Sequence, residues 1–309
     1  MNKLIISNTN NPFFNIALEK ELFENIKDNE RILYLWQNDK TVVIGRNQNP
    51  FLECIVKKLL DDGGYVARRL SGGGAVYHDL GNLNFTFISK NVDSDIKNQT
   101  ELIIDAVSKF GITSESSGRN DILAYGKKYS GHAFYEEDDK CFHHGTLLLN
   151  VDTDYLELIL NPSELKLKSK GISSVKQRVV NLNTLNNSID TVNMMDSLKL
   201  SFEKYYGEFS SVQIYDQNNY IPKYFELFSD ETWIYGESPQ YDVVKEIKSE
   251  EGHFKFCFDV KDGAIQTVKI YTDSILNINL SKIEEQLKGK FFHDVCEYNT
   301  LIKENVFSK

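Results

Sequence analysis

Hydrophobic residues in the first two thirds of the chain follow two spacings, one typical of helices and one typical of strands. Six apolar residues between Phe13 and Ile26 recur at helical spacing behind Asn11 and Pro12, a pair that favours a helix start. This pattern predicts a helix from residue 12 to about residue 27. Similar patterns predict further helices at residues 52–60, 102–110, 155–160 and 192–206.

Alternating or continuous apolar runs predict strands at residues 31–36, 41–46, 65–70, 75–79, 83–89, 122–125, 132–136 and 142–151. Asn38 and Asp39 separate the first two runs, which predicts a hairpin. Gly72–Gly74 separate the third run from the fourth, which predicts a second hairpin with a glycine bend. Because strands and helices are interleaved, we expect an α/β (α+β) fold with a large mixed sheet.

The pattern changes after residue 240. Residues 220–240 contain two prolines, a tryptophan and a glycine, and they predict an irregular connector. Three alternating runs follow at 241–247, 253–260 and 265–271, separated by turn signals at 251–252 and 262–263, and two helical segments follow at 280–288 and 292–303. The chain therefore divides into a larger domain, residues 1–240, and a small accessory domain, residues 241–309.

Composition narrows the class of protein. The 309 residues are 41% hydrophobic and 26% charged, which is ordinary for a folded chain with a sizeable core. The net charge of −10 argues against a nucleic-acid partner, although a local basic pocket would still suit ATP. No apolar stretch approaches the roughly 18 residues of a membrane span. The four cysteines have no zinc spacing, which predicts reduced thiols and a cytoplasmic location.

The glycine bend carries the strongest chemical signal. Arg68 and Arg69 precede it, and guanidinium groups suit carboxylate or phosphate. Glycines allow a ligand to approach the backbone closely, and their N–H groups can face an anion. The string fits neither the dinucleotide fingerprint nor the Walker A loop, because the glycines are contiguous and strands flank them. A purely structural hairpin turn is the alternative.

Three more polar strings lie at the edges of apolar strands: residues 118–121 (GRND), 126–133 (GKKYSGHA) and 143–149 (HHGTLLL). Each places a charged or donor side chain beside glycine. Donors that converge on one sheet would suit a negatively charged ligand that contains phosphate.

These strings occur in one order between residues 68 and 179, and together they resemble the lipoate–protein ligases of the A type, in the biotin/lipoate protein ligase superfamily. The family pattern is RRxSGGGAVYHDxGN, then RND, KxSGxA, HHGTLL and KGIxSVxxRV, and residues 170–179 supply the last string. The resemblance implies a catalytic domain with a large mixed sheet and a small C-terminal accessory domain.

The resemblance also implies a reaction in two steps. Lipoate attacks the α-phosphorus of ATP to give lipoyl-AMP and pyrophosphate, with Mg²⁺ as the expected metal. A lysine of an acceptor then displaces AMP. The implied acceptors are lipoyl domains of 2-oxoacid dehydrogenase E2 subunits or the glycine cleavage H protein. Because both steps gather negative charge on oxygens, positioning and electrostatic stabilisation should dominate catalysis.

Lys128 matches the active-site lysine of the family, and its neighbour Lys127 is expected to be a solvated surface residue. The implied lipoate and adenylate contacts are Arg69, Ser71, Gly72, Gly73, Gly74, Ala75, His78, Asn82, Asn120, Asp121, Gly145, Thr146 and Lys170. Asp121 would also bind magnesium. Residues 163–178 match a loop that orders over nucleotide. Each of four residues has a structural alternative. Asn82 would be a turn residue, His78 or His144 a buried structural residue, and Lys170 part of a solvated loop.

Two features depart from this picture. His132 stands where the family often has a small residue; we expect its ring to point to solvent, and a ring that lines the pocket mouth is the alternative. Cys141 precedes the HHGT string, so a cysteine-dependent octanoyl or lipoyl transferase is an alternative, although we expect Cys141 to be an ordinary strand residue. A transferase that uses preformed lipoyl-AMP and a binding protein with a decayed site are further alternatives. The accessory domain argues against a transferase that uses preformed lipoyl-AMP, and Lys128 argues against a binding protein with a decayed site.

Overall fold

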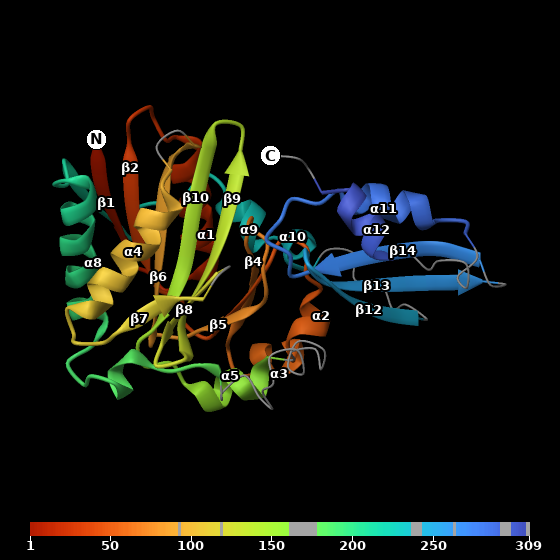
Figure 1. The fold of residues 1–309 in the computed structure, drawn as a ribbon, viewed down its shortest axis with the longest axis horizontal. Coiled ribbons are helices and arrows are strands. Elements are labelled where there is room, and N and C mark those ends of the chain that lie inside the picture. The colour runs from red at the N-terminus through yellow and green to blue at the C-terminus, as the bar shows by residue number, and fades with distance from the viewer. Residues whose placement is uncertain are drawn as a thin grey trace.

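The computed structural model describes residues 1–91, 94–117, 120–160, 178–235, 243–261, 264–290 and 298–306. Its larger part contains two sheets, and its C-terminal part contains a third sheet beside them (Figure 1). The mixed α/β architecture confirms the predicted fold class. The predicted division at residue 240 falls outside the described residues.

The main sheet has eight strands in the order β11-β1-β2-β6-β10-β9-β8-β7. Its strands are β1 Asn2–Ser7, β2 Arg31–Trp36, β6 Asn82–Lys90, β7 Ser114–Ser116, β8 Asp121–Ala124, β9 Lys127–Glu137, β10 Lys140–Leu148 and β11 Ser211–Tyr215. β1 is parallel to both of its neighbours, and the other pairs are antiparallel.

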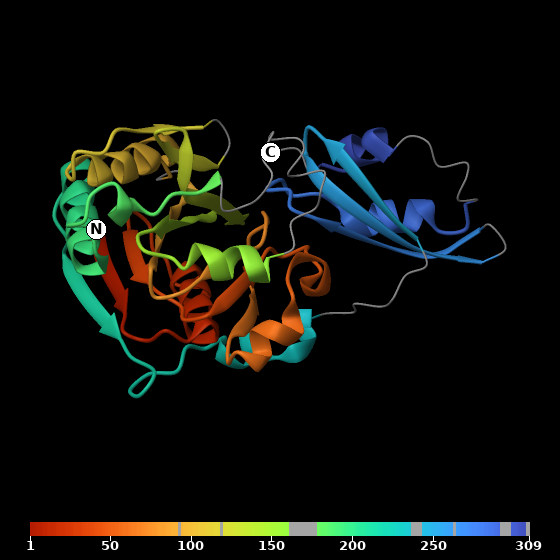
Figure 2. The ribbon, with the colours of Figure 1, turned by 90° about the horizontal axis from the view of Figure 1, so that it is seen from below.

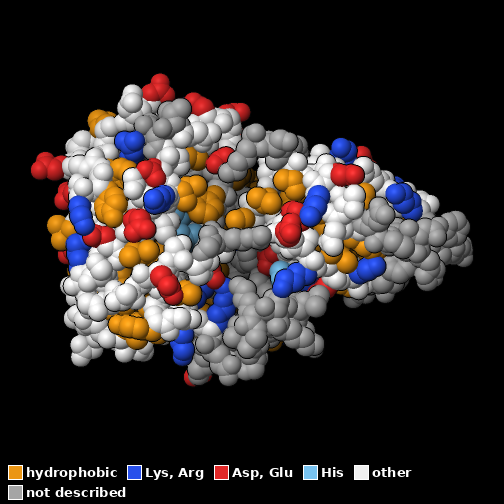
Figure 3. Space-filling view, in the orientation of Figure 1, with side chains coloured by type: hydrophobic (Ala, Val, Ile, Leu, Met, Phe, Trp, Pro, Cys, Tyr) orange, Lys and Arg blue, Asp and Glu red, His pale blue; other side chains and the backbone are white. Residues whose placement is uncertain are grey.

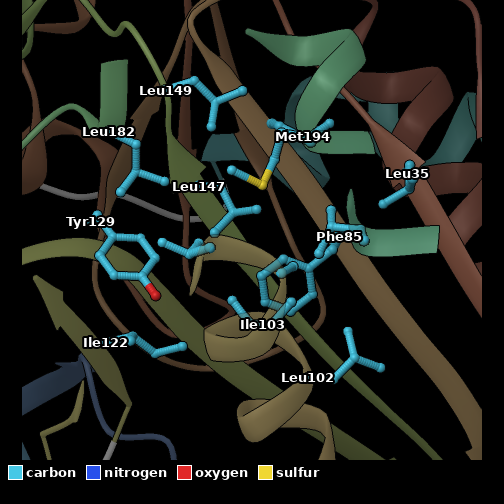
Figure 4. Packing of buried hydrophobic residues seen from close by; sticks show 14 of the residues in the cluster. Leu35, Phe85, Leu102, Ile103, Ile122, Tyr129, Leu147, Leu149, Leu182 and Met194 are labelled. Carbon is cyan, nitrogen blue, oxygen red and sulfur yellow. The ribbon is translucent and has the colours of Figure 1, made fainter. Parts of the chain in front are cut away.

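Helices cover both faces of the main sheet (Figure 2). On one face lie α4 (Ile96–Ser108) and α8 (Thr191–Tyr206), whose apolar residues pack on those of β6 and β10 (Figure 4). On the other face lies α1 (Pro12–Glu24), which begins as predicted, because the Asn11 side chain accepts hydrogen bonds from the first turn. The helix α9 (Phe225–Ser229) packs on α1.

A three-stranded sheet has the order β4-β3-β5, with β3 Thr41–Ile44, β4 Tyr65–Arg68 and β5 Val76–His78. Both hairpin predictions are wrong. The first fails because β2 and β3 belong to different sheets, and the second because β3 lies between β4 and β5 and pairs with both. The glycine bend therefore crosses from one side of β3 to the other instead of closing a hairpin.

Short helices pack around this small sheet. They are α2 Pro50–Glu53, α3 Val56–Asp61, α5 Thr153–Ile159, the 3₁₀ turn η2 Leu182–Thr184 and α10 Glu231–Tyr235. The predicted helix 52–60 is broken, because Cys54 has an extended backbone and bridges to Leu160.

The C-terminal part is an antiparallel sheet of β12 (Val243–Ser249), β13 (Gly252–Lys261) and β14 (Ala264–Thr272), as predicted. Two helices, α11 (Leu280–Leu287) and α12 (Tyr298–Glu304), cover one face of this sheet. A separate apolar core joins sheet and helices, with Phe254, Phe256, Phe258, Ile283 and Ile302 at its centre. The turn at 262–263 and the start of the predicted helix 292–303 lie outside the described residues.

The two parts touch through backbone hydrogen bonds. The Gly73 N–H donates to Ser274 O at 3.1 Å, and the Thr272 N–H donates to Asn47 O at 2.8 Å. Lys and Arg side chains are interspersed with Asp and Glu over the face in Figure 3 rather than gathered by sign. None of the described helices combines the length and hydropathy needed to cross a membrane.

Candidate active site

A pocket of about 470 Å³ opens between the main sheet, the β4-β3-β5 sheet and the C-terminal part. The main sheet contributes its α1-facing surface, and the glycine bend contributes Gly73 and Gly74. Residues 248–249, 251–253 and 273–275 of the C-terminal part close the pocket from the opposite side. Three elements far apart in the sequence therefore build one cavity.

One row of facing residues forms the floor of the pocket. Strand register aligns Trp36, Asn84, Thr146, Gly131 and Asp121 across β2, β6, β10, β9 and β8. All five line the pocket. Paired residues of neighbouring strands share a face of the sheet, so the row grades from an aromatic end to a charged end.

Lys128 supplies the cation at the charged end. Its Nζ lies 2.7 Å from Asp121 Oδ1, and the Arg178 guanidinium pairs with the other oxygen of the same carboxylate. The Lys128 side chain is 17% exposed, whereas Lys127 is an exposed residue. The structure thus brings Lys128 to the pocket, as the sequence predicts.

Gly131 makes room for the lysine ammonium. A Cβ at this position would lie 2.5 Å from Lys128 Nζ and 2.8 Å from Lys128 Cε. Real Cβ atoms do not approach other atoms so closely, so any side chain at 131 would push the ammonium aside. The side chain of Lys128 therefore crosses directly over this glycine on the pocket face.

The described side chains do not form a metal cage. In the described parts of the chain, no three His, Cys, Asp or Glu residues come together as possible ligands. Asp121 is already engaged by Lys128 and Arg178. Magnesium keeps several waters and commonly arrives with substrate phosphates, so a single protein carboxylate could still contact it.

Arg69 stabilises the glycine bend, whereas Arg68 binds carbonyl oxygens outside it. Arg69 donates to Ser71 Oγ at 3.0 Å, to Gly72 O at 2.7 Å and to Gly74 O at 2.8 Å. Arg68 donates to carbonyl oxygens of residues 45, 46, 48, 233 and 234. Burial lowers the pKa of each arginine to about 10. These donors serve the chain's own carbonyls, and only Arg69 reaches the pocket wall.

Gly72, the first residue of the bend, and Ser71 before it make their contacts outside the pocket. A Cβ on Gly72 would be 2.2 Å from Ser274 O, so this glycine is where the C-terminal part docks. Ser71 Oγ bonds to His144 Nε2 at 2.7 Å. Neither residue lines the pocket, whereas the predicted residues Arg69, Gly73, Gly74, Ala75, His78, Asn82, Asn120, Asp121, Gly145 and Thr146 do.

A buried carboxylate that the sequence analysis missed supports His144. Glu19 Oε1 lies 2.9 Å from His144 Nδ1 and accepts from Thr86 Oγ1 at 2.7 Å. Glu19 is 1% exposed and lines the pocket. Its signal in the sequence is its place three residues after Ile16 and four before Phe23, on the apolar stripe of the first helix.

His78 presents a donor to the pocket. Its Nδ1 accepts from Asn38 Nδ2 at 3.2 Å, which places the ring proton on Nε2. Burial and, secondarily, nearby Arg69 and His144 lower the pKa of His78 to about 3, so the ring is neutral. Among the described residues, its buried Nε2 has no hydrogen-bond partner. A buried donor without a partner at a pocket wall suits a ligand acceptor.

The prediction that His132 faces solvent is wrong. His132 is 6% exposed, and its ring lies on the α4 face of the sheet, with its edge against Phe85. The reason is strand alternation: Gly131 faces the pocket, so its neighbour faces the other way. His132 Nδ1 lies 2.8 Å from His143 Nε2, and His143 Nδ1 lies 2.8 Å from Gln99 Oε1. His132 is also among the residues that line the pocket.

The cysteines that the structure describes are buried away from the pocket chemistry. Cys141 is 6% exposed and lies 3.6 Å from Ser89 Oγ, without lining the pocket. Burial raises the pKa of Cys54 to about 12 and that of Cys257 to about 11. Cys141 is therefore a strand residue, as expected. Cys296 and residues 163–177 of the predicted loop 163–178, Lys170 among them, lie outside the described residues, whereas Arg178 lines the pocket.

Comparison with known proteins identifies the family of the chain. Residues 11–203 match the family model for the lipoyl protein ligase A/B catalytic domain, and residues 238–296 match that for the bacterial lipoate protein ligase C-terminus. The chain is 38% identical to a lipoate-protein ligase A of Bdellovibrio bacteriovorus, over 94% of this chain and 88% of the relative. It is 41% identical to one of Psychrobacter cryohalolentis, over 90% and 85%.

A solved structure has the same architecture over nearly the whole chain. The crystal structure of P. falciparum LipL1 in complex with lipoate superimposes with a TM-score of 0.80 at 32% identity, covering 98% of both chains. The agreement extends through the C-terminal sheet, because the coverage includes both parts.

Proposed function

Because the chain belongs to the lipoyl protein ligase A/B family, we propose that it is an ATP-dependent lipoate–protein ligase. One observation carries the proposal: the Lys128 ammonium and the glycine bend face the same pocket. A cation beside backbone that a ligand can approach closely suits an acyl phosphate anhydride. The solved relative holds lipoate, and a structural neighbour of the same fold holds ATP.

In the first step a carboxylate oxygen of lipoate attacks the α-phosphorus of ATP. The new P–O bond forms as the bond to pyrophosphate breaks, and pyrophosphate leaves with the electron pair. Lys128 would stabilise the negative charge that gathers on the phosphoryl oxygens. Gly73 and Gly74 would let the acyl phosphate lie against the backbone.

In the second step the amine of an acceptor lysine attacks the acyl carbon and AMP leaves. Lipoyl domains of E2 subunits or the H protein are the proposed acceptors, and Mg²⁺ is proposed to enter with the ATP phosphates next to Asp121. The C-terminal residues that close the pocket would protect the anhydride from water. The cytoplasmic location stays a prediction.

A transferase that works through a cysteine thioester is less well supported. The three described cysteines are buried, and none of them lines the pocket. A transferase that only uses preformed lipoyl-AMP is separated from a ligase by the first step. Lipoate-dependent exchange of labelled pyrophosphate into ATP measures that step directly.

The test compares Lys128→Ala with Lys127→Ala in this exchange assay. We expect Lys128→Ala to lower the exchange rate by on the order of 10²- to 10³-fold, because a charge-stabilising donor is lost. Lys127→Ala should exchange at the wild-type rate, since that side chain is exposed. Near-normal exchange by a folded Lys128→Ala protein would overturn the role of the lysine, and no exchange by wild type would overturn the ligase.

A further inference from the structure

We propose that Asn84 donates a hydrogen bond to the acyl carbonyl oxygen of the activated substrate, and that Asn82 fixes the orientation of its amide. The proposal rests on the ligase function and deepens it, because it names the group that stabilises the second step. Asn84 belongs to none of the site residues predicted from the sequence. Two observations and one chemical argument support the proposal. The observations are the unpaired amide donor of Asn84 and its position in the pocket, and the argument is the charge that acyl transfer creates on the carbonyl oxygen.

Asn84 is a buried amide with a donor left over. It is 1% exposed, and its Oδ1 accepts from Asn82 Nδ2 at 2.9 Å. This bond occupies the oxygen end of the Asn84 amide, and both residues line the pocket. Among the described residues, buried Nδ2 has no hydrogen-bond partner. A buried donor without a partner is unfavourable, so we expect a group of the bound substrate to accept this hydrogen bond.

The position of Asn84 identifies that partner. On one side, its neighbour in the floor row is Trp36, and Ile16 and Val43 make this end of the pocket apolar. On the other side come Thr146 and then Gly131, over which the Lys128 ammonium lies, two strand spacings or about 10 Å away.

An acyl adenylate has the same order of groups: an aliphatic chain, a carbonyl and a phosphate. With the chain at the Trp36 end and the phosphate beside Lys128, the carbonyl falls in the middle of the row. Asn84 is the row residue with a free amide donor at that point. The polar group that would complete its hydrogen bonding is therefore the acyl oxygen.

The chemistry of transfer needs a donor there. The lone pair of the lysine amine forms a C–N bond to the acyl carbon, and the C=O π pair moves onto the oxygen. When that pair returns, the C–O bond to AMP breaks, AMP leaves with the bonding electrons, and the amine nitrogen gives up its proton to a phosphate oxygen of the leaving AMP. A fixed N–H that faces the oxygen stabilises the charge between these events. During activation the same oxygen gains less charge.

Two substitutions test the role of Asn84. Asn84→Ala removes the donor, and Asn84→Asp keeps the shape but replaces the donor with an acceptor. With lipoyl-AMP bound to excess protein and hydroxylamine as the acceptor, we expect a single-turnover rate 10²- to 10³-fold below wild type for both variants. Pyrophosphate exchange should fall much less. Asn218→Ala, in an exposed turn, should match wild type in both assays.

A pair of unreactive ligands separates this role from a structural one. One is the acyl sulfamate of adenosine with the lipoyl carbonyl, and the other has CH₂ in place of that carbonyl. We expect both variants to bind the first at least tenfold more weakly than wild type does, and to bind the second as wild type does. If the Asn84 variants bind both ligands equally more weakly than wild type does, or if they transfer the lipoyl group at the wild-type rate, the assignment is overturned. If wild type itself does not exchange pyrophosphate, the ligase function fails instead.

Discussion

At the scale of single residues, the pocket depends on the charge of Lys128 and on the absence of a side chain at Gly131. Lys128 carries the charge, and Gly131 lacks the Cβ that would occupy the place of its ammonium. The backbone of Gly131 is ordinary β-strand, paired with Thr146 and Asp121. The requirement for glycine is therefore steric and local. It applies to the position of one nitrogen atom rather than to the fold of the strand.

We predict that Gly131→Ala lowers the rate of pyrophosphate exchange by about 10²-fold, because displacing a catalytic group by 1 Å can cost that much. The thermal midpoint should change little. Combined with Lys128→Ala, the substitution should add nothing further, since its effect passes through the lysine. An additional loss in the double variant would show that Gly131 acts by another route.

The residue scale also shows where sequence reasoning succeeded. The order of the motifs placed Lys128, His78, Gly73 and Gly74 at one pocket, because strand ends that carry polar residues next to glycine meet at a sheet face. The motif order misplaced His132, because a motif does not say which face of the sheet each of its residues points to. It missed Glu19, whose carboxylate contacts Thr86 and His144, and Asn84, which pairs with Trp36 on the next strand, because these partners are distant in the sequence.

At the scale of elements, hydrogen-bonded histidines join the sheet to a helix. His132 on β9 bonds to His143 on β10, and His143 bonds to Gln99 on α4. Both rings are buried among Phe85 and Phe87. Burial lowers the pKa of His132 to about 3 and that of His143 well below its ordinary value. The fold therefore holds both histidines in the neutral form.

This neutral pair predicts acid sensitivity of the fold. Unfolded histidine titrates near pH 6.5, so below that pH the unfolded chain binds protons that the native chain refuses, and stability falls as the pH drops toward 3. At pH 5 the loss is about 2 kcal/mol for His132 alone. Urea unfolding at pH 7.5 and pH 5 measures it. His132→Gln should shrink the difference between the two pH values, and an unchanged difference would contradict the pairing.

Elements differ in how far the sequence predicted them. The first helix and the C-terminal meander follow their patterns, because caps and turns near in sequence define them. The two hairpins failed, because β3 pairs with β4 and β5 rather than with β2. Pairing across sheets is decided by long-range packing, including Arg68, whose donors join β4 to the end of α10.

At the scale of the whole molecule, the C-terminal part rests on the glycine bend. Ser274 O accepts from the Gly73 N–H and occupies the space where a Cβ on Gly72 would lie. The same bend lines the pocket. A ligand anion that needs the Gly73 N–H must therefore compete with Ser274, which couples ligand binding to the docking of this part.

We predict that Gly72→Ala moves the C-terminal part without unfolding either core, because a new methyl group would lie 2.2 Å from Ser274 O. In small-angle scattering without ligand, the variant should have a larger radius of gyration than wild type. Wild-type scattering curves with and without lipoyl-AMP also measure whether this part moves when the ligand binds. Superimposable curves for the variant and wild type would contradict the docking role.

The pairing of β1 with both β2 and β11 affects how the chain folds during its synthesis. β1 hydrogen-bonds to β2 on one edge and to β11, more than 200 residues later, on the other. During synthesis the outer edge of β1 stays open until residue 215 has emerged, and open strand edges invite association with other chains. The match to the catalytic family ends at residue 203, before β11 and before the carbonyls at 233 and 234 that Arg68 holds. A catalytic fragment for separate expression should therefore extend through Tyr235.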